Sequence, residues 1–193
     1  MTRDEFDESY SLYQLSELIE QLPSKRKVKE LLQTFKCSKN SDLESFLHNK
    51  AITFEKHLRS RTYLYVDNET KKVSAYFTIA VSTLHTDGIS PEVIKMLDGY
   101  QNDTKSIPCF LIGQLGKSDD CSCSGEFLLE DTIDTIDELH YAIGGRFILL
   151  DSVNVEEVIE FYKRSLFFPI EEAEEEEEQE GIKMIRPYFE ELE

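Results

Sequence analysis

The stretch IPCFLIGQLGKSDDCSCSGEFLLEDTIDTIDELHYAIGGRFILLDS, residues 107–152, decides the order of elements around which the rest of the chain is arranged. Residues 107–115 form a nearly continuous apolar run, which is typical of a central strand. After a loop of small and polar residues, apolar side chains recur at helical spacing up to Ile143, and two glycines end the helix. A second apolar run follows at 146–152. The stretch therefore predicts a strand, a loop, a long helix and a second strand, as in α/β folds.

The long helix has the clearest periodicity in the sequence. Its outer side carries acidic residues, among them Asp131, Asp134 and Glu138. Its apolar side consists of Phe127, Leu129, Ile133, Ile136, Leu139 or His140, and Ile143. This pattern predicts a helix that packs one side against the sheet and turns its acidic side to solvent.

The sequence that follows predicts a further helix and two closing strands. Asn154 and Glu157 are spaced as a capping box at the start of that helix. The strands are predicted at 167–170 and 182–189, and a glutamate-rich segment, 171–180, separates them. Because neighbouring carboxylates repel one another, we expect this acidic insertion to be a solvated loop.

Two β-rich runs precede the central strand. Residues 62–66 and 72–84 flank a polar turn and predict an antiparallel hairpin. Ser90, as N-cap, and Pro91, at the first helical position, predict a short helix between the hairpin and the central strand.

The N-terminal part of the chain is predicted to be helical. Ser41 or Asp42 is expected to cap a helix that ends near Arg59. In the first thirty residues, a helical pattern ends at Pro23 and is made of Leu12, Leu15, Leu18, Ile19 and Leu22. We therefore expect a helical appendage at 1–30 and one main domain at 31–193.

Composition limits the classes of function. The formal net charge of −18 works against binding to nucleic acid, whose phosphates attract Lys and Arg. The polar N-terminus and the lack of any run of eighteen apolar residues favour a soluble, cytoplasmic protein without a membrane segment. The four cysteines lack the CxxC and Cys/His spacing of zinc sites, so we expect reduced thiols and no metal site.

Two groups of residues stand out within this order of elements. The first lies before the central strand and consists of Phe35, Cys37, Leu43, Phe46, Leu47, Ala51, Tyr63, Tyr76 and Phe77. The second lies near the C-terminus and consists of Phe161, Tyr162, Phe167 and Pro169. Together with the order of elements, these residues resemble the GNAT superfamily of N-acetyltransferases, and its toxin-like subgroup in particular, whose C-terminal signature is Phe-Tyr-x-x-x-Gly-Phe-x-Pro. The resemblance covers about residues 31–193. It implies an α/β (α+β) GNAT fold, with a mixed sheet of six to seven strands and helices on both faces.

The sequence departs from this family where chemistry is expected. In the phosphate motif, Gln/Arg-x-x-Gly-x-Gly/Ala, the aligned residues are Asp120, Cys123 and Gly125, and only Gly125 matches. The loop is also about two residues shorter, and Leu166 stands in place of the glycine of the Phe-Tyr signature.

The resemblance implies transfer of an acetyl group from acetyl-CoA to a primary amine, by direct attack in a ternary complex. Tyr162 would reprotonate the departing CoA thiolate, and Gln114 and Leu115 would bind pantetheine through their backbone. The pyrophosphate would lie at a helix N-terminus, which offers free N–H groups to an anion. The residues implied there are Cys121, Ser122, Cys123, Ser124, Gly125 and Glu126.

The sequence leaves the remaining roles open. The base that deprotonates the amine would be Tyr76, His85 or a water molecule. Toxin-like relatives suggest aminoacyl-tRNA as acceptor, but the net charge favours a small-molecule or protein amine, and a cationic one would suit the acidic field. A homodimer also remains open. The competing interpretation is a GNAT-fold module that has lost catalysis and binds a partner.

Overall fold

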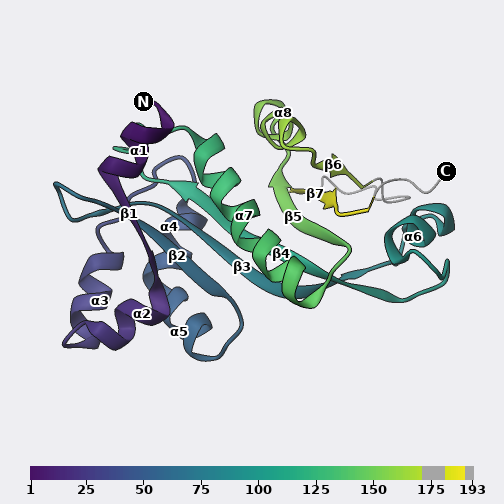
Figure 1. The fold of residues 1–193 in the computed structure, drawn as a ribbon, viewed down its shortest axis with the longest axis horizontal. Helices are drawn as coiled ribbons and strands as arrows, with labels where there is room; N and C mark the ends of the chain where they lie inside the picture. Colours follow the sequence, from purple (N-terminus) through teal and green to yellow (C-terminus); the bar gives the residue numbers. More distant parts are fainter. Residues whose placement is uncertain (171–180, 190–193) are drawn as a thin grey trace. The chain divides into compact units, whose positions relative to one another are not determined.

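The computed structural model describes residues 1–170 and 181–189, and Figure 1 shows its elements. The predicted acidic insertion, 171–180, lies outside these residues. None of the described helices is long and apolar enough to cross a membrane.

Within the described residues, seven strands form a mixed sheet in the order β1-β2-β3-β4-β5-β7-β6. The strands are β1 (Tyr10–Gln14), β2 (Arg61–Asp67), β3 (Val73–His85), β4 (Ser106–Lys117), β5 (Phe147–Val153), β6 (Phe168–Pro169) and β7 (Gly181–Pro187). The helices are α1 (Arg3–Ser9), α2 (Leu15–Gln21), α3 (Lys25–Leu32), α4 (Ser41–Asn49), α5 (Ala51–Lys56), α6 (Pro91–Asp98), α7 (Gly125–Ile143) and α8 (Glu156–Arg164). The predicted class, with six to seven strands and a central strand near 107–115, is confirmed.

The chain divides into two compact units. The first comprises Met1–Ala80 and Gly113–Ile133, and the second comprises Val81–Ile112 and Asp134–Glu193. Three elements, β3, β4 and α7, contribute residues to both units. The boundary that we predict at residue 30 is a different division and stays a prediction.

In the first unit, β1, β2 and β3 form an antiparallel meander with helices on both faces. One face packs against α2, α3, α4 and α5 around a core of Leu15, Leu18, Val28, Leu32, Phe35, Cys37, Leu47, Ala51, Leu64, Val66, Val73 and Tyr76. On the other face, the ring of Tyr65 lies against Phe6 of α1, which in turn contacts Phe127 of α7. Alternation along β2 therefore separates the two cores, because Leu64 and Tyr65 point to opposite faces.

The N-terminal segment differs from its prediction. Tyr10–Gln14 forms a strand that pairs with β2, so the prediction of helix at Leu12 is wrong. The helix begins at Leu15, and its residues Leu15 and Leu18 are buried. The pairing supplies backbone hydrogen bonds to an existing sheet edge, and such a long-range effect overrides a local helical pattern.

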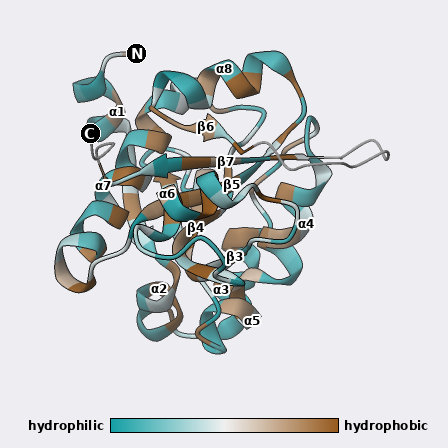
Figure 2. Cartoon of the chain, turned by 90° about the vertical axis from the view of Figure 1, so that its right-hand side faces the viewer, coloured by the Kyte–Doolittle hydropathy of each residue, from teal (hydrophilic) through white to brown (hydrophobic). Residues whose placement is uncertain are grey.

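In the second unit, β4 and β5 are parallel, and β7 pairs antiparallel with both β5 and β6. One core is formed by residues of α6 and of the strands, and it consists of Leu84, Ile89, Ile94, Leu97, Ile107, Cys109, Phe147, Leu149, Ile170 and Ile185. Along α8, hydrophilic and hydrophobic residues lie next to each other (Figure 2), as expected of a helix with one packed side.

Helix starts and ends match the sequence signals in some places only. Ser90 caps α6, and α7 ends at Ile143 before two glycines with positive φ, both as predicted. The cap of α4 is Asn40, whose side chain accepts from the amides of Asp42 and Leu43, so the prediction of Ser41 or Asp42 is wrong.

Two further helix predictions need correction. The single helix predicted up to Arg59 is interrupted at Lys50 and continues as α5. The capping box of Asn154 and Glu157 is not formed, because Val155 occupies the N-cap position of α8 and makes no side-chain cap bond. A helix start that is one residue later than expected leaves Asn154 outside the cap.

Candidate functional site

The end of β4 carries Gln114 and Leu115, both partly buried. The side-chain amide of Gln114 donates to the carbonyl of Gly113 at 2.6 Å, and its Oε1 accepts from the hydroxyl of Tyr76 at 3.4 Å. At Gly116 an added Cβ would lie 2.5 Å from Leu43, so helix α4 approaches the strand closely here. The backbone of β4 is therefore held in place just before the loop.

The loop between β4 and α7 is fixed by two charged side chains. Lys117 Nζ donates to the carbonyl oxygen of Cys123 at 2.7 Å. The carboxylate of Asp119 accepts from the backbone amide and hydroxyl of Ser38, each at 3.0 Å, and the amide of Asp119 donates to the carbonyl of Lys36. The carboxylate of Asp119 thus anchors the loop to the segment before α4.

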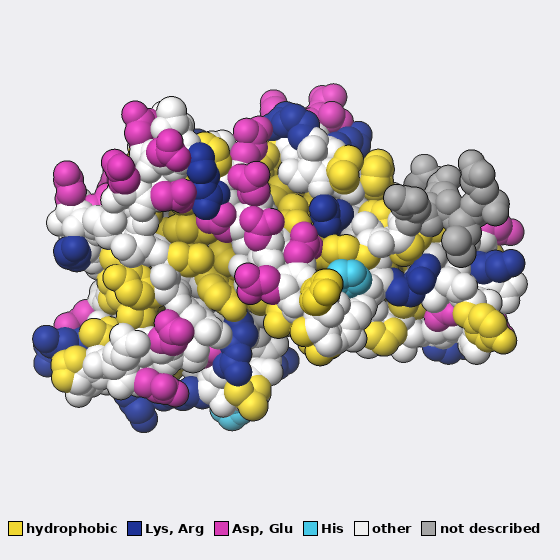
Figure 3. Space-filling model, viewed as in Figure 1, with side chains coloured by type: hydrophobic (Ala, Val, Ile, Leu, Met, Phe, Trp, Pro, Cys, Tyr) yellow, Lys and Arg dark blue, Asp and Glu magenta, His cyan; other side chains and the backbone are white. Residues whose placement is uncertain are grey.

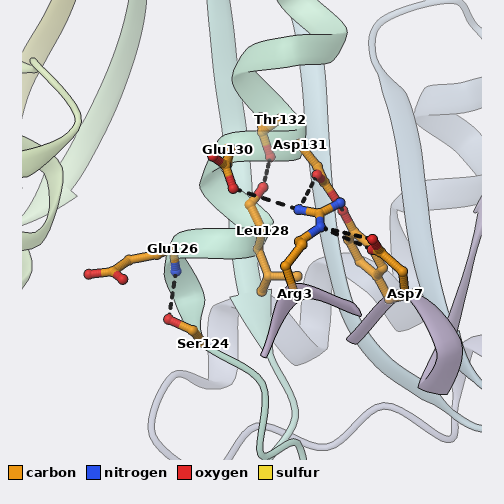
Figure 4. A network of polar contacts seen from close by, with 9 residues as sticks. Arg3, Asp7, Ser124, Glu126, Leu128, Glu130, Asp131 and Thr132 are labelled. Atoms are coloured by element: carbon orange, nitrogen blue, oxygen red, sulfur yellow. Dashed lines mark hydrogen bonds and ion pairs between the residues drawn. The ribbon is translucent and has the colours of Figure 1, made fainter. Parts of the chain in front are cut away.

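Helix α7 begins directly after this loop, and Ser124 caps its first turn. Ser124 Oγ accepts from the amide of Glu126 at 3.2 Å (Figure 4). One of the amides at the helix start is therefore already bonded, while Gly125 brings backbone without a side chain to this point.

The first half of α7 is tied to α1 through Arg3 (Figure 4). The guanidinium lies 2.6 Å from the carboxylate of Asp131 and 3.0 Å from that of Asp7, and it also lies over the ring of Phe127. The hydroxyl of Tyr65 donates to Asp131 at 2.5 Å. These contacts hold the first half of α7 against the sheet of the first unit.

Two cysteines of the loop lie in contact. Sγ of Cys121 is 2.9 Å from Sγ of Cys123 and 3.9 Å from the hydroxyl of Tyr10. A hydrogen bond from the thiol of Cys123 lowers the pKa of Cys121 to about 6, although burial opposes the shift. The same interaction and burial raise the pKa of Cys123 above its ordinary value. The pair therefore loses a first proton readily and holds the second.

Tyr162 lies on α8 and is partly buried. Its ring makes edge contacts with Phe161 and Phe167, at centroid distances of 5.0 and 5.8 Å. Burial raises the pKa of its phenol to about 12. The phenol consequently keeps its proton at neutral pH, which is the state a general acid requires.

The two candidate bases have different surroundings. Tyr76 is fully buried, donates to the carbonyl of Leu43 at 2.8 Å and packs edge-on against Phe35. Burial raises the pKa of its phenol well above the usual range, which favours a structural role over proton abstraction. His85 is exposed at the end of β3.

Among the described residues, no group of three or more His, Cys, Asp or Glu side chains could hold a metal ion.

Comparison with known proteins gives fold likeness rather than sequence likeness. No protein-family model and no curated protein matches the sequence. A solved structure described as a bacterial toxin is 17% identical, with a TM-score of 0.68 over 92% of this chain and 89% of that chain. AtaT complexed with acetyl-methionyl-tRNAfMet is 19% identical, with a TM-score of 0.66 over 92% and 94%. AtaTR bound with AcCoA is 17% identical, with a TM-score of 0.67 over 93% and 94%. The chain has the GNAT fold, which it shares with these solved structures.

Within this GNAT fold, the residues predicted for the cofactor form one continuous segment of the first unit. They run from Gln114 at the end of β4 to Glu126 in the first turn of α7. The predicted acid, Tyr162, belongs to the second unit. Their roles stay predictions.

Sequence reasoning missed two anchors of the GNAT loop. Ser38 bonds Asp119 across 81 positions of the chain, and Tyr10 reaches Cys121 across 111 positions. Neither residue type signals such a partner locally, so only the three-dimensional fold reveals them.

Proposed function

We propose that this chain is a GNAT-type acyltransferase that moves the acetyl group of acetyl-CoA to a primary amine. The observation that carries the proposal is the loop between β4 and α7. It joins a central strand to the N-terminus of a 19-residue helix, in the same fold as AtaTR bound with AcCoA. Such a helix start attracts a pyrophosphate through its unpaired amides and partial positive charge.

The residues of this loop fit a bound phosphate in size. The side chains from Cys121 to Ser124 are those of cysteine and serine, and Gly125 allows the closest approach of the backbone. The carboxylate of Asp119 bonds Ser38, which reduces the repulsion that its sequence position would suggest. The proposed cofactor-binding residues are Gln114, Leu115, Cys121, Ser122, Cys123, Ser124, Gly125 and Glu126.

The proposed chemistry needs one acid and one base from the protein. The thioester of acetyl-CoA supplies an activated acyl group. Tyr162, whose phenol is protonated at neutral pH, donates its proton to the leaving thiolate. Because Tyr76 is buried and donates to Leu43, we favour His85 or a water molecule as the base.

The acceptor is proposed to be a small-molecule or protein amine with positive charge. Figure 3 shows Asp and Glu side chains in a row over α7, and the exposed acidic residues spaced four apart on this helix are Glu126, Glu130, Asp134 and Glu138. Such a row attracts cations and repels the phosphates of RNA. AtaT is seen with a tRNA, but a net charge of −18 argues against that acceptor class here.

Cofactor binding is the decisive experiment. The thermal midpoint of the protein should rise with acetyl-CoA, and calorimetry should give a single site. Gly125→Asp adds a carboxylate where the phosphate would lie and should abolish the shift. Tyr141→Asp is the matched control, because it adds the same charge at a 94% exposed position on α7. The thermal midpoint of this variant should still rise with acetyl-CoA. Lack of binding at millimolar acetyl-CoA would sink the enzyme proposal and favour a non-catalytic binding module.

A further inference from the structure

Two thiols that have no chemical step in the proposed acetyl transfer lie side by side in the loop. The 2.9 Å between Sγ of Cys121 and Sγ of Cys123 is within about 1 Å of the sulfur–sulfur distance of a disulfide. Both side chains are buried, with 8% and 1% of their surface exposed, although the neighbouring Asp120 and Ser122 are exposed. Little movement separates the dithiol from a covalent bond.

The surroundings of the pair favour a reactive thiolate at Cys121. Its sulfur accepts a hydrogen bond from Cys123 once ionised, and the positively charged Lys117 binds the carbonyl of Cys123 nearby. The other two cysteines are separate from this pair. Cys37 and Cys109 lie in the hydrophobic cores of the first and second unit, and burial raises the pKa of Cys109 to about 12.

We propose that Cys121 and Cys123 form a reversible redox site, in which a hydroperoxide oxidises the two thiols to a disulfide. Formation of this disulfide weakens the binding of acetyl-CoA by the loop. The first part stands on the contact between the two sulfur atoms. The second part rests on the function proposed above.

The reaction balances with a hydroperoxide as oxidant. With hydrogen peroxide, the thiolate of Cys121 attacks one peroxide oxygen, the O–O bond breaks, a sulfenic acid forms and hydroxide leaves. The sulfur of Cys123 then attacks the sulfenic sulfur, the S–S bond forms, and the sulfenic oxygen departs as water with the thiol proton. The hydroxide takes up the proton that Cys121 released on ionising. Two electrons pass from the two thiols to the peroxide, and a dithiol reductant reverses the change.

Closure affects the backbone that would hold the phosphate. The disulfide would join residues on both sides of Ser122, while the amide of Cys121 bonds the carbonyl of Ser118 and the carbonyl of Cys123 bonds Lys117. A disulfide draws the sulfur atoms together by about 0.9 Å and also restricts the dihedral angle about the S–S bond, so we expect closure to shift the loop backbone or these bonds. Backbone donors at a binding site act only when held within about 0.5 Å of their productive position.

Thiol mapping tests the site without reference to any activity. The intact protein is treated with hydrogen peroxide, and its four thiols are followed by alkylation and peptide mass. We expect the peptide with Cys121 and Cys123 to lose two hydrogens, dithiothreitol to restore them, and Cys37 and Cys109 to stay reduced. In Cys123→Ser, Cys121 should stop at a sulfenic acid that dimedone traps. In Cys121→Ser, Cys123 should not react.

Retention of all four thiols in the folded protein, or bridges between chains, would overturn the redox site. So would equal reaction of Cys123 in Cys121→Ser. Both serine variants should keep the thermal midpoint of the wild type, which shows that they fold.

Calorimetry with acetyl-CoA then tests the effect on binding. We expect oxidation to raise the Kd of the wild type by at least about tenfold, and to leave the Kd of the double variant Cys121→Ser, Cys123→Ser unchanged. Equal affinity of the reduced and oxidised wild type would overturn the effect on binding. If neither form binds acetyl-CoA, the proposed function fails, whereas the disulfide mapping still decides the redox site.

Discussion

At the scale of single residues, Leu166 shows why the C-terminal signature of the family carries a glycine. Its φ is +64°, and it follows the end of α8. The amide of Leu166 bonds the carbonyl of Lys163, and that of Phe167 bonds the carbonyl of Tyr162. This is a Schellman motif, in which the left-handed position favours glycine. The turn is thus built with a side chain that strains it.

We predict that Leu166→Gly stabilises the protein. The left-handed conformation costs leucine about 1–2 kcal/mol, while glycine adds about 0.5–1 kcal/mol of lost backbone entropy, so the net gain should be about 0.5–1 kcal/mol. Little burial is lost, since 60% of Leu166 is exposed. Urea unfolding measures the change. Leu166→Ala keeps the strain and should bring no gain; an equal gain in that variant would contradict the explanation.

The phenol of Tyr162 gives the second residue-scale prediction. If it protonates the leaving thiolate, Tyr162→Phe should lower kcat by about 10²-fold or more and leave the Kd of acetyl-CoA nearly unchanged. Initial rates and calorimetry separate the two effects. Phe161→Leu, a change beside the same ring, should lower kcat much less. Unchanged turnover in Tyr162→Phe would remove this residue from the acid role.

At the scale of elements, α1 is fixed to α7 by a partly buried polar cluster. Only 14% of the Asp131 side chain is exposed, and it receives both Arg3 and the hydroxyl of Tyr65. Phe6 of α1 adds ring contacts with Tyr10 and Tyr65. The N-terminal segment therefore supports the helix on which the proposed phosphate site depends.

We predict that Arg3→Met destabilises the protein by about 1–2 kcal/mol, because Asp131 keeps its burial and loses a charged partner. The matched control is Arg26→Met. Arg26 also pairs with a carboxylate, that of Glu30 at 2.7 Å, but 87% of its side chain is exposed, so its loss should cost less than about 0.5 kcal/mol. Urea unfolding of both variants measures the two losses in the free energy of unfolding. Equal costs would mean that burial of Asp131 is unimportant.

Elements differ in how far the sequence predicts them. The segment 107–152 was predictable because an apolar run and a long helical period are local signals of burial. The strand β1 was not, since Leu12 fits a helical pattern and only pairing with β2 decides otherwise. In the site, resemblance points to the loop and to Tyr162, but contacts such as Ser38 with Asp119 depend on the folded chain.

At the scale of the whole molecule, the tyrosines determine the alkaline limit of stability. Burial raises the pKa of Tyr10 and Tyr162 to about 12, and it raises those of Tyr65, Tyr76 and Tyr188 as well. A folded pKa above the unfolded value of about 10 means that the native state holds protons that the unfolded chain has lost. Their contribution is complete below pH 10 and is lost as pH rises toward 12 and above.

We therefore predict that the free energy of unfolding falls above about pH 10, by up to about 1.4 kcal/mol per pH unit for each such tyrosine. Urea unfolding at a series of pH values measures the slope, and tyrosinate absorbance follows the ionisation. Tyr162→Phe should reduce this slope by the contribution of one tyrosine. Tyr141→Phe, at a 94% exposed position, should leave the slope unchanged. A slope equal to that of the wild type in Tyr162→Phe would show that burial does not hold the proton on Tyr162 above pH 10.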